Sequence, residues 1–172
     1  GAGLLQPYSG NLSRVILGGA FAGTRTKGEG AAGSLPLTAD MLLNEPSGNL
    51  FGLTQATAMG WNPEEVGHDQ YVIVSTHGGL RAEDGSAVAL GYHTGHWEVN
   101  LLVREAANTF KANAAVPFAV YVTDPCDGRS QGTDGMMDSL AFRNDGAMVA
   151  RRLIRSLPTR DGIMGIGTCD KG

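Results

Sequence analysis

The chain has 172 residues, of which 42% are hydrophobic and 17% charged, which is the balance of a globular chain and not of a disordered one. The formal net charge is -4, and the scattered lysines and arginines form no basic footprint for nucleic acid. No apolar run approaches the roughly 20 residues of a membrane span. We therefore expect a protein that binds neither nucleic acid nor membrane. Because it begins with Gly1, we also expect a piece of a longer protein.

The first part of the chain is poor in regular patterns. Residues 1–36 are rich in Gly, Ser and Thr, and we interpret them as a loop-rich lead-in to a partial α/β domain over residues 37–172. Thr38 is a suitable N-cap for a short helix over residues 41–43. The run Asn-Pro-Glu-Glu at residues 62–65 predicts a second helix start, with a capping Asn, Pro at the first helical position and acids in the first turn.

From residue 71 onward, strands and helices alternate. A β-branched run predicts a strand over residues 71–75, and two further short apolar runs predict strands over residues 116–122 and 163–167. Helical spacing predicts helices over residues 99–110 and 146–157. The first of these helices has one apolar face, made of Val99, Leu102, Val103, Ala106, Ala107 and Phe110. The alternation predicts an α/β fold with a mainly parallel sheet covered by helices. Ligands of such sheets bind beyond the carboxyl ends of the strands.

Two of the predicted strands are followed by a Cys-Asp pair. Cys126-Asp127 follows the second strand, and Cys169-Asp170 follows the third. If the strands are parallel, both pairs lie at one edge of the sheet. Thiolates suit iron–sulfur clusters or zinc, and carboxylates suit magnesium, so the pairs are able to serve two neighbouring metals of different character. Lys171 fits beside a cation only if it is neutral or modified, because an ammonium group repels a cation.

Other interpretations of these residues remain open at this stage. The cysteines can be buried structural thiols beside turn-forming aspartates, in an α/β binding module without catalysis. They can also pair as a redox disulfide, although the chain has no CxxC motif. His93 and His96 are candidate neighbours of a substrate or a cluster, with capping or polar surface roles as the alternative.

Longer stretches of the chain resemble a known family. The run from Asp124 to Leu140 and the ending Thr168-Cys-Asp-Lys-Gly172 resemble the dihydroxy-acid dehydratase / phosphogluconate dehydratase family. Residues 46–52, 59–65 and 152–158 are similar to the D-xylonate dehydratase branch of that family. The resemblance covers about residues 34 to 172, and its Cys-Asp-Lys motif is the most specific part.

The resemblance implies a role for each residue of the two pairs. Cys169 matches a ligand of an iron–sulfur cluster, of the 2Fe-2S or the 4Fe-4S type. Asp127 and Asp170 match magnesium ligands, and Lys171 matches a carbamylated lysine that binds Mg²⁺ through its carbamate. Many members place a first cluster cysteine before the first long helix, where this chain has none. Either Cys126 replaces that ligand or the cluster is held differently.

The activity implied by the resemblance is that of a hydro-lyase. The full-length protein would remove water from a 2,3-dihydroxy sugar acid, D-xylonate or a similar aldonic acid, to give a 2-keto-3-deoxy acid in sugar-acid catabolism. A cytoplasmic homo-oligomer is expected. The alternative within the family is dihydroxy-acid dehydration in branched-chain amino-acid synthesis. The family's catalytic base is a serine far downstream, so we predict that these 172 residues alone are inactive.

Overall fold

The computed structural model describes residues 37–172, and the predicted lead-in over residues 1–36 lies outside the described part. The chain divides after Glu64 into two compact units. In the first unit, α2 (Ala39–Asn44) has the predicted cap, because the Oγ1 of Thr38 accepts a hydrogen bond of 3.1 Å from the Met41 amide.

Two features of the segment before the sheet differ from the prediction. α3 (Ser47–Ala58) was not predicted, because it contains two glycines, which disfavour helix, and has no marked apolar face. The predicted helix start at residues 62–65 is wrong. Asn62 instead accepts a hydrogen bond of 3.2 Å from the Glu64 amide, and residues 63–67 form turns. β1 begins at Gln70, so this segment is too short for a stable helix.

The second unit is built on a parallel sheet. Its strands are β1 (Gln70–Thr76), β4 (Val116–Val122) and β5 (Gly162–Ile166), in the order β4-β1-β5. Both pairings with the central β1 are parallel, with Thr76 opposite Val122 and Ser75 opposite Ile166. The predicted α/β class is confirmed. The register brings the carboxyl ends of β4 and β5 to the same edge of the sheet.

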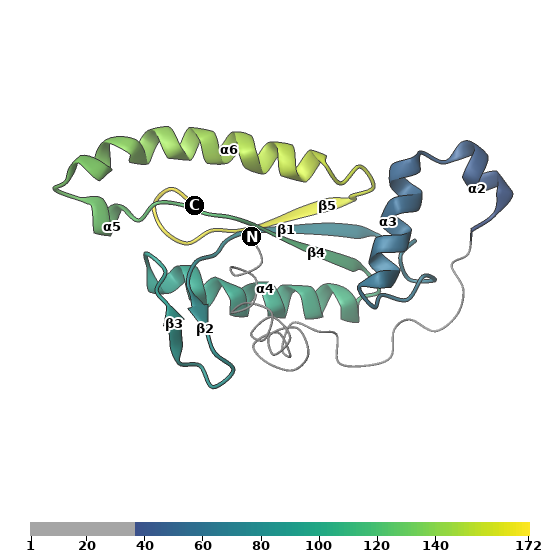
Figure 1. The fold of residues 1–172 in the computed structure, drawn as a ribbon, viewed down its shortest axis with the longest axis horizontal. Helices are drawn as coiled ribbons and strands as arrows, with labels where there is room; N and C mark the ends of the chain where they lie inside the picture. The colour runs from purple at the N-terminus through teal and green to yellow at the C-terminus, as the bar shows by residue number, and fades with distance from the viewer. Residues whose placement is uncertain (1–36) are drawn as a thin grey trace, which may run out of the picture. The chain divides into compact units, whose positions relative to one another are not determined.

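Two long helices cover the sheet. α4 (Thr94–Ala112) lies on one face and α6 (Ser139–Arg155) on the other (Figure 1). The buried core under α4 is Ile73, Val99 and Val103, with Ala106, Ala107, Phe110 and Ile166 packed against it. The predicted apolar face is therefore confirmed except at Leu102, which is 57% exposed. α6 begins seven residues before the predicted start at Gly146 (146 − 139 = 7).

Smaller elements complete the edge where β4 and β5 end. β2 (Leu80–Arg81) and β3 (Ala87–Ala89) form a short antiparallel hairpin, and α5 (Asp127–Ser130) and the 3-10 helix η1 (Asp134–Asp138) connect β4 to α6. Among the residues that the structure describes, no helix is both long and apolar enough to cross a membrane.

Candidate functional site

The two Cys-Asp pairs meet at the carboxyl edge of the sheet, as the spacing predicted. Cys126 follows β4 and lies at the N-cap of α5, whereas Cys169 lies in the loop after β5. Cys126, Asp127, Cys169 and Asp170 line one open cavity of about 450 Å³. The parallel order of the strands thus brings together thiols and carboxylates that lie far apart in the sequence.

Lys171 links the two carboxylates of this cavity. Its Nζ lies 2.8 Å from the Oδ2 of Asp127 and 2.9 Å from the Oδ2 of Asp170. The Ser139 hydroxyl donates a hydrogen bond to the other oxygen of Asp127. The hydrogen bonds from Lys171 and Ser139 lower the pKa of Asp127, and the same carboxylates raise the pKa of Lys171. As an ammonium, Lys171 occupies the place that a cation bound by these carboxylates would take; as a carbamate, it would become a further ligand.

Cys169 is held in an unusual backbone conformation. Its φ angle is +85°, in the left-handed region that favours glycine and costs other residues about 1–3 kcal/mol. The residue before it is anchored to β1, because the Thr168 amide donates a hydrogen bond of 3.2 Å to the Oγ1 of Thr76. Burial raises the pKa of the Cys169 thiol, and the neighbouring Cys126 thiol raises it further. Both cysteines are free thiols, and Cys126 is buried.

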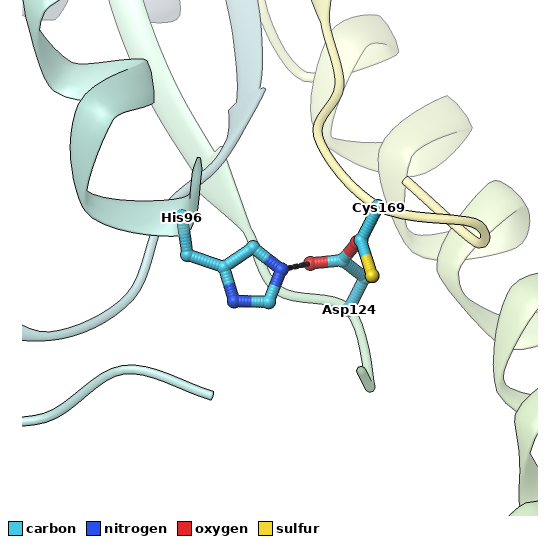
Figure 2. Close-up of side chains that lie close together, drawn as sticks. All are labelled: His96, Asp124 and Cys169. Carbon is cyan, nitrogen blue, oxygen red and sulfur yellow. Dashed lines mark ion pairs between the residues drawn. The ribbon is translucent and has the colours of Figure 1, made fainter. Parts of the chain in front are cut away.

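A buried ion pair lies beside Cys169. The Nε2 of His96, in the first turn of α4, is 2.7 Å from the Oδ1 of Asp124, in the loop after β4. Figure 2 shows the imidazole pointing at the carboxylate, with the sulfur of Cys169 next to it. His96 is 2% exposed and Asp124 is 3% exposed. Burial raises the pKa of Asp124, and the attraction of His96 opposes that rise.

The sequence analysis missed Asp124 as a functional candidate. The available signal was its position, since it is the first charged side chain after β4 and lies directly before Pro125-Cys126. His96 was predicted only as a neighbour of a substrate or a cluster. The partner of His96 is Asp124, which lies in the loop after β4, so the periodicity of α4 gives no information about this pair.

His93 has the capping role that was predicted as an alternative. It is the N-cap of α4, and its Nδ1 accepts a hydrogen bond of 2.9 Å from the Gly95 amide. In a neutral imidazole, a nitrogen that accepts leaves the proton on the other nitrogen. The Nε2 of His93 therefore carries hydrogen in this arrangement and is not available as a metal ligand, although His93 lines the same cavity.

The loop that carries Cys169 leaves no room for a side chain at Gly167. A Cβ there would lie 2.8 Å from the carbonyl carbon of Gly172, which is a backbone contact. We expect Gly167→Ala to lower the free energy of unfolding by about 1–3 kcal/mol and to shift the loop. Urea unfolding measures this, with Gly165→Ala as the control, because nothing lies within 4 Å of a Cβ at Gly165. Equal stability of the two variants would contradict the tight loop.

The second unit of the chain matches a known family. The sequence profile described as "Dihydroxy-acid/6-phosphogluconate dehydratase N-terminal" matches residues 87–172, which is half of the chain. The chain belongs to this family. The matched region contains α4, β4, α6 and β5 together with both Cys-Asp pairs. The family resemblance is therefore confirmed.

Two curated relatives cover most of the chain. It is 55% identical over 153 residues to the D-xylonate dehydratase YagF of Escherichia coli (strain K12), which is 89% of this chain. It is 56% identical over 148 residues, or 86% of the chain, to the D-xylonate dehydratase YjhG of the same strain. In each case the match spans only 23% of the relative's length.

Proposed function

We propose that the full-length protein is a hydro-lyase that removes water from D-xylonate or a similar aldonic acid and gives a 2-keto-3-deoxy acid, as a step of sugar-acid catabolism. The observation that carries this proposal is the joint placement of soft thiols and hard carboxylates around one cavity, in a member of a dehydratase family. The two relatives, at 55% and 56% identity, are named D-xylonate dehydratases, which supports the substrate.

The donor set at the cavity fits the two groups that the family implies. Cys126 and Cys169 would hold an iron–sulfur cluster, of the 2Fe-2S or the 4Fe-4S type. Asp127, Asp170 and Lys171 would hold Mg²⁺, with Lys171 as its carbamate, because the carboxylates that now contact its ammonium group are hard ligands. When bound, these groups supply Lewis acids that make the C3 hydroxyl a better leaving group and the C2 proton more acidic.

Side chains of this chain set the orientation and the ionisation of Asp127 at the proposed magnesium site. The hydrogen bond from Ser139 holds one oxygen of Asp127, and it lowers the pKa of that carboxyl group. Asp127 and Asp170 line an open cavity, so a small polar acid has access to these two carboxylates. We assign the catalytic base to a serine outside this chain, following the resemblance. The 172 residues alone are therefore expected to be inactive.

The absence of a disulfide between the two cysteines of the described residues is consistent with the cytoplasmic location that we propose. Both are free thiols, and ligand cysteines persist in a reducing compartment. We also propose that the full-length protein is a homo-oligomer, as expected for the family.

The test of this function is a substrate comparison. Anaerobically reconstituted full-length protein is assayed for keto-acid formation from D-xylonate and from 2,3-dihydroxy-3-methylbutanoate, the substrate of the alternative branch. We expect kcat/KM for D-xylonate to be higher by about 100-fold or more, because polar pockets reject analogues that leave their groups unpaired. The 172 residues alone are the control and should form no keto acid. Preference for the branched acid would overturn the proposal.

A further inference from the structure

One cluster of donor atoms at this edge of the sheet combines Cys169 with two residues that the proposed reaction does not use. His96, Asp124 and Cys169 offer a nitrogen, an oxygen and a sulfur that all lie within 4.8 Å of one another. They come from α4, from the loop after β4 and from the loop after β5, so three parts of the fold converge on one point (Figure 2). The three residues are far apart in the sequence, so only the fold brings their side chains together.

The carboxylate of Asp124 is incompletely satisfied. One oxygen contacts His96, but the other is buried and accepts no hydrogen bond from any other described residue. Burial of an ionised carboxylate without enough hydrogen-bond partners is unfavourable. The oxygen is also enclosed, because a Cβ at Gly172 would lie 2.8 Å from it. This arrangement indicates a position for a ligand of the carboxylate that the protein itself does not provide.

The charges and donor atoms of these three side chains indicate which kind of metal ion they can bind. A divalent ion with one carboxylate, one thiolate and one neutral imidazole gives a site without net charge, which suits residues as buried as His96 and Asp124. Sulfur and imidazole nitrogen favour zinc-like transition metals over Mg²⁺ or Ca²⁺. In a tetrahedral zinc site the ligand atoms lie about 3.3–3.7 Å apart. The three donor atoms lie within 4.8 Å of one another, and the Nε2 of His96 is 2.7 Å from the Oδ1 of Asp124, so binding of one ion requires the side chains to rotate.

We propose that His96, Asp124 and Cys169 form a mononuclear site for a divalent transition-metal ion of the zinc class, filled when the iron–sulfur cluster is absent. Three protein ligands leave a fourth position for water. The site shares Cys169 with the cluster of the proposed function, so one chain holds either the single ion or the cluster. Zinc is thereby a competitor of cluster assembly. The competition rests on the proposed function, whereas binding of the ion does not.

The binding test uses Co²⁺ as a spectroscopic probe of the full-length, cluster-free protein under anaerobic conditions. We expect one Co²⁺ per chain with a sulfur-to-cobalt charge-transfer band and the intense visible bands of a tetrahedral ion, and stoichiometric Zn²⁺ should abolish both. His96→Ala, Asp124→Asn and Cys169→Ser should each weaken binding by about tenfold or more. Circular dichroism checks that the variants fold, and Asp124→Asn keeps the size of the side chain.

The matched control is His93→Asn, because His93 lies close by, with its ring centre 5.9 Å from that of His96, yet belongs to the helix cap. Asn preserves the cap, so Co²⁺ binding should remain unchanged. Unaltered charge-transfer bands in both His96→Ala and Asp124→Asn would overturn the site. So would loss of the bands in Cys126→Ser, because the ion would then be held by the two thiols.

A second arm tests the competition. The protein is reconstituted with iron and sulfide with and without one equivalent of Zn²⁺, and cluster absorbance is recorded. Zinc should suppress assembly in the wild type, and His96→Ala should assemble the cluster in its presence. Equal suppression in both proteins would contradict competition through the site that contains His96. A protein that binds Co²⁺ as described but does not dehydrate D-xylonate would refute the proposed function alone.

Discussion

Cys169→Ser is expected to remove most of the cluster iron from the full-length protein and to lower kcat/KM for D-xylonate by more than about 100-fold. Even residues that only support metal ligands cost 10–100-fold when they are replaced, and Cys169 is proposed as a direct ligand. Serine keeps the size of the side chain but replaces a soft sulfur with a hard oxygen. The measurements are iron and sulfide content, the visible spectrum and keto-acid formation.

Cys126→Ser is the informative companion of that variant. If Cys126 stands in for the missing early cysteine, its replacement should reduce the iron content as strongly as Cys169→Ser does. If Cys126 is a buried structural thiol, the cluster should assemble and only thermal stability should fall. Wild-type iron content in Cys169→Ser would contradict the cluster assignment in either case.

Lys171→Arg is expected to lower kcat/KM by more than about 100-fold while the cluster remains intact. Arginine keeps the positive charge beside Asp127 and Asp170 but does not form a carbamate, so the proposed magnesium site stays blocked by a cation. Lys171→Glu carries a fixed carboxylate and should bind Mg²⁺ more tightly than Lys171→Arg. Mg²⁺ titration of both variants, with cluster absorbance as the control, provides the comparison.

The carbamate itself has a pH signature. Only the neutral amine reacts with carbon dioxide, and contact with two carboxylates raises the pKa of Lys171, so less neutral amine exists at a given pH. At a constant concentration of dissolved carbon dioxide, activation of the metal-free protein in the presence of Mg²⁺ should therefore become faster as the pH rises. Labelled bicarbonate should give a carbamate signal in the wild type and none in Lys171→Arg. The same signal in Lys171→Arg would contradict the assignment.

The parallel sheet was predictable because its strands are short apolar runs that alternate along the chain with segments of helical spacing. α3 was not, since Gly48 and Gly52 argue locally against a helix. The hairpin over residues 80–89 has exposed strands of two and three residues, and such strands leave no alternating pattern in the sequence.

The candidate site also has features that could be predicted from the sequence and features that could not. The two Cys-Asp pairs were predictable as neighbours, because each follows a strand and parallel strands end at one edge. The His96–Asp124 pair was not predictable, because it depends on how α4 packs against the sheet. The left-handed conformation of Cys169 was equally hidden, since nothing in its neighbours indicates that a residue other than glycine takes that conformation.

The contact between Asp127 and Lys171 spans 44 residues of sequence and exists only when β4 and β5 are both paired with β1. An unfolded chain therefore has no preassembled set of metal ligands. Ions that bind only the folded form shift the folding equilibrium toward it by mass action. If the protein binds the proposed cluster and Mg²⁺, metal supply and protein abundance are therefore coupled: a cell short of iron or magnesium would hold more of this protein in the unfolded form that proteases degrade.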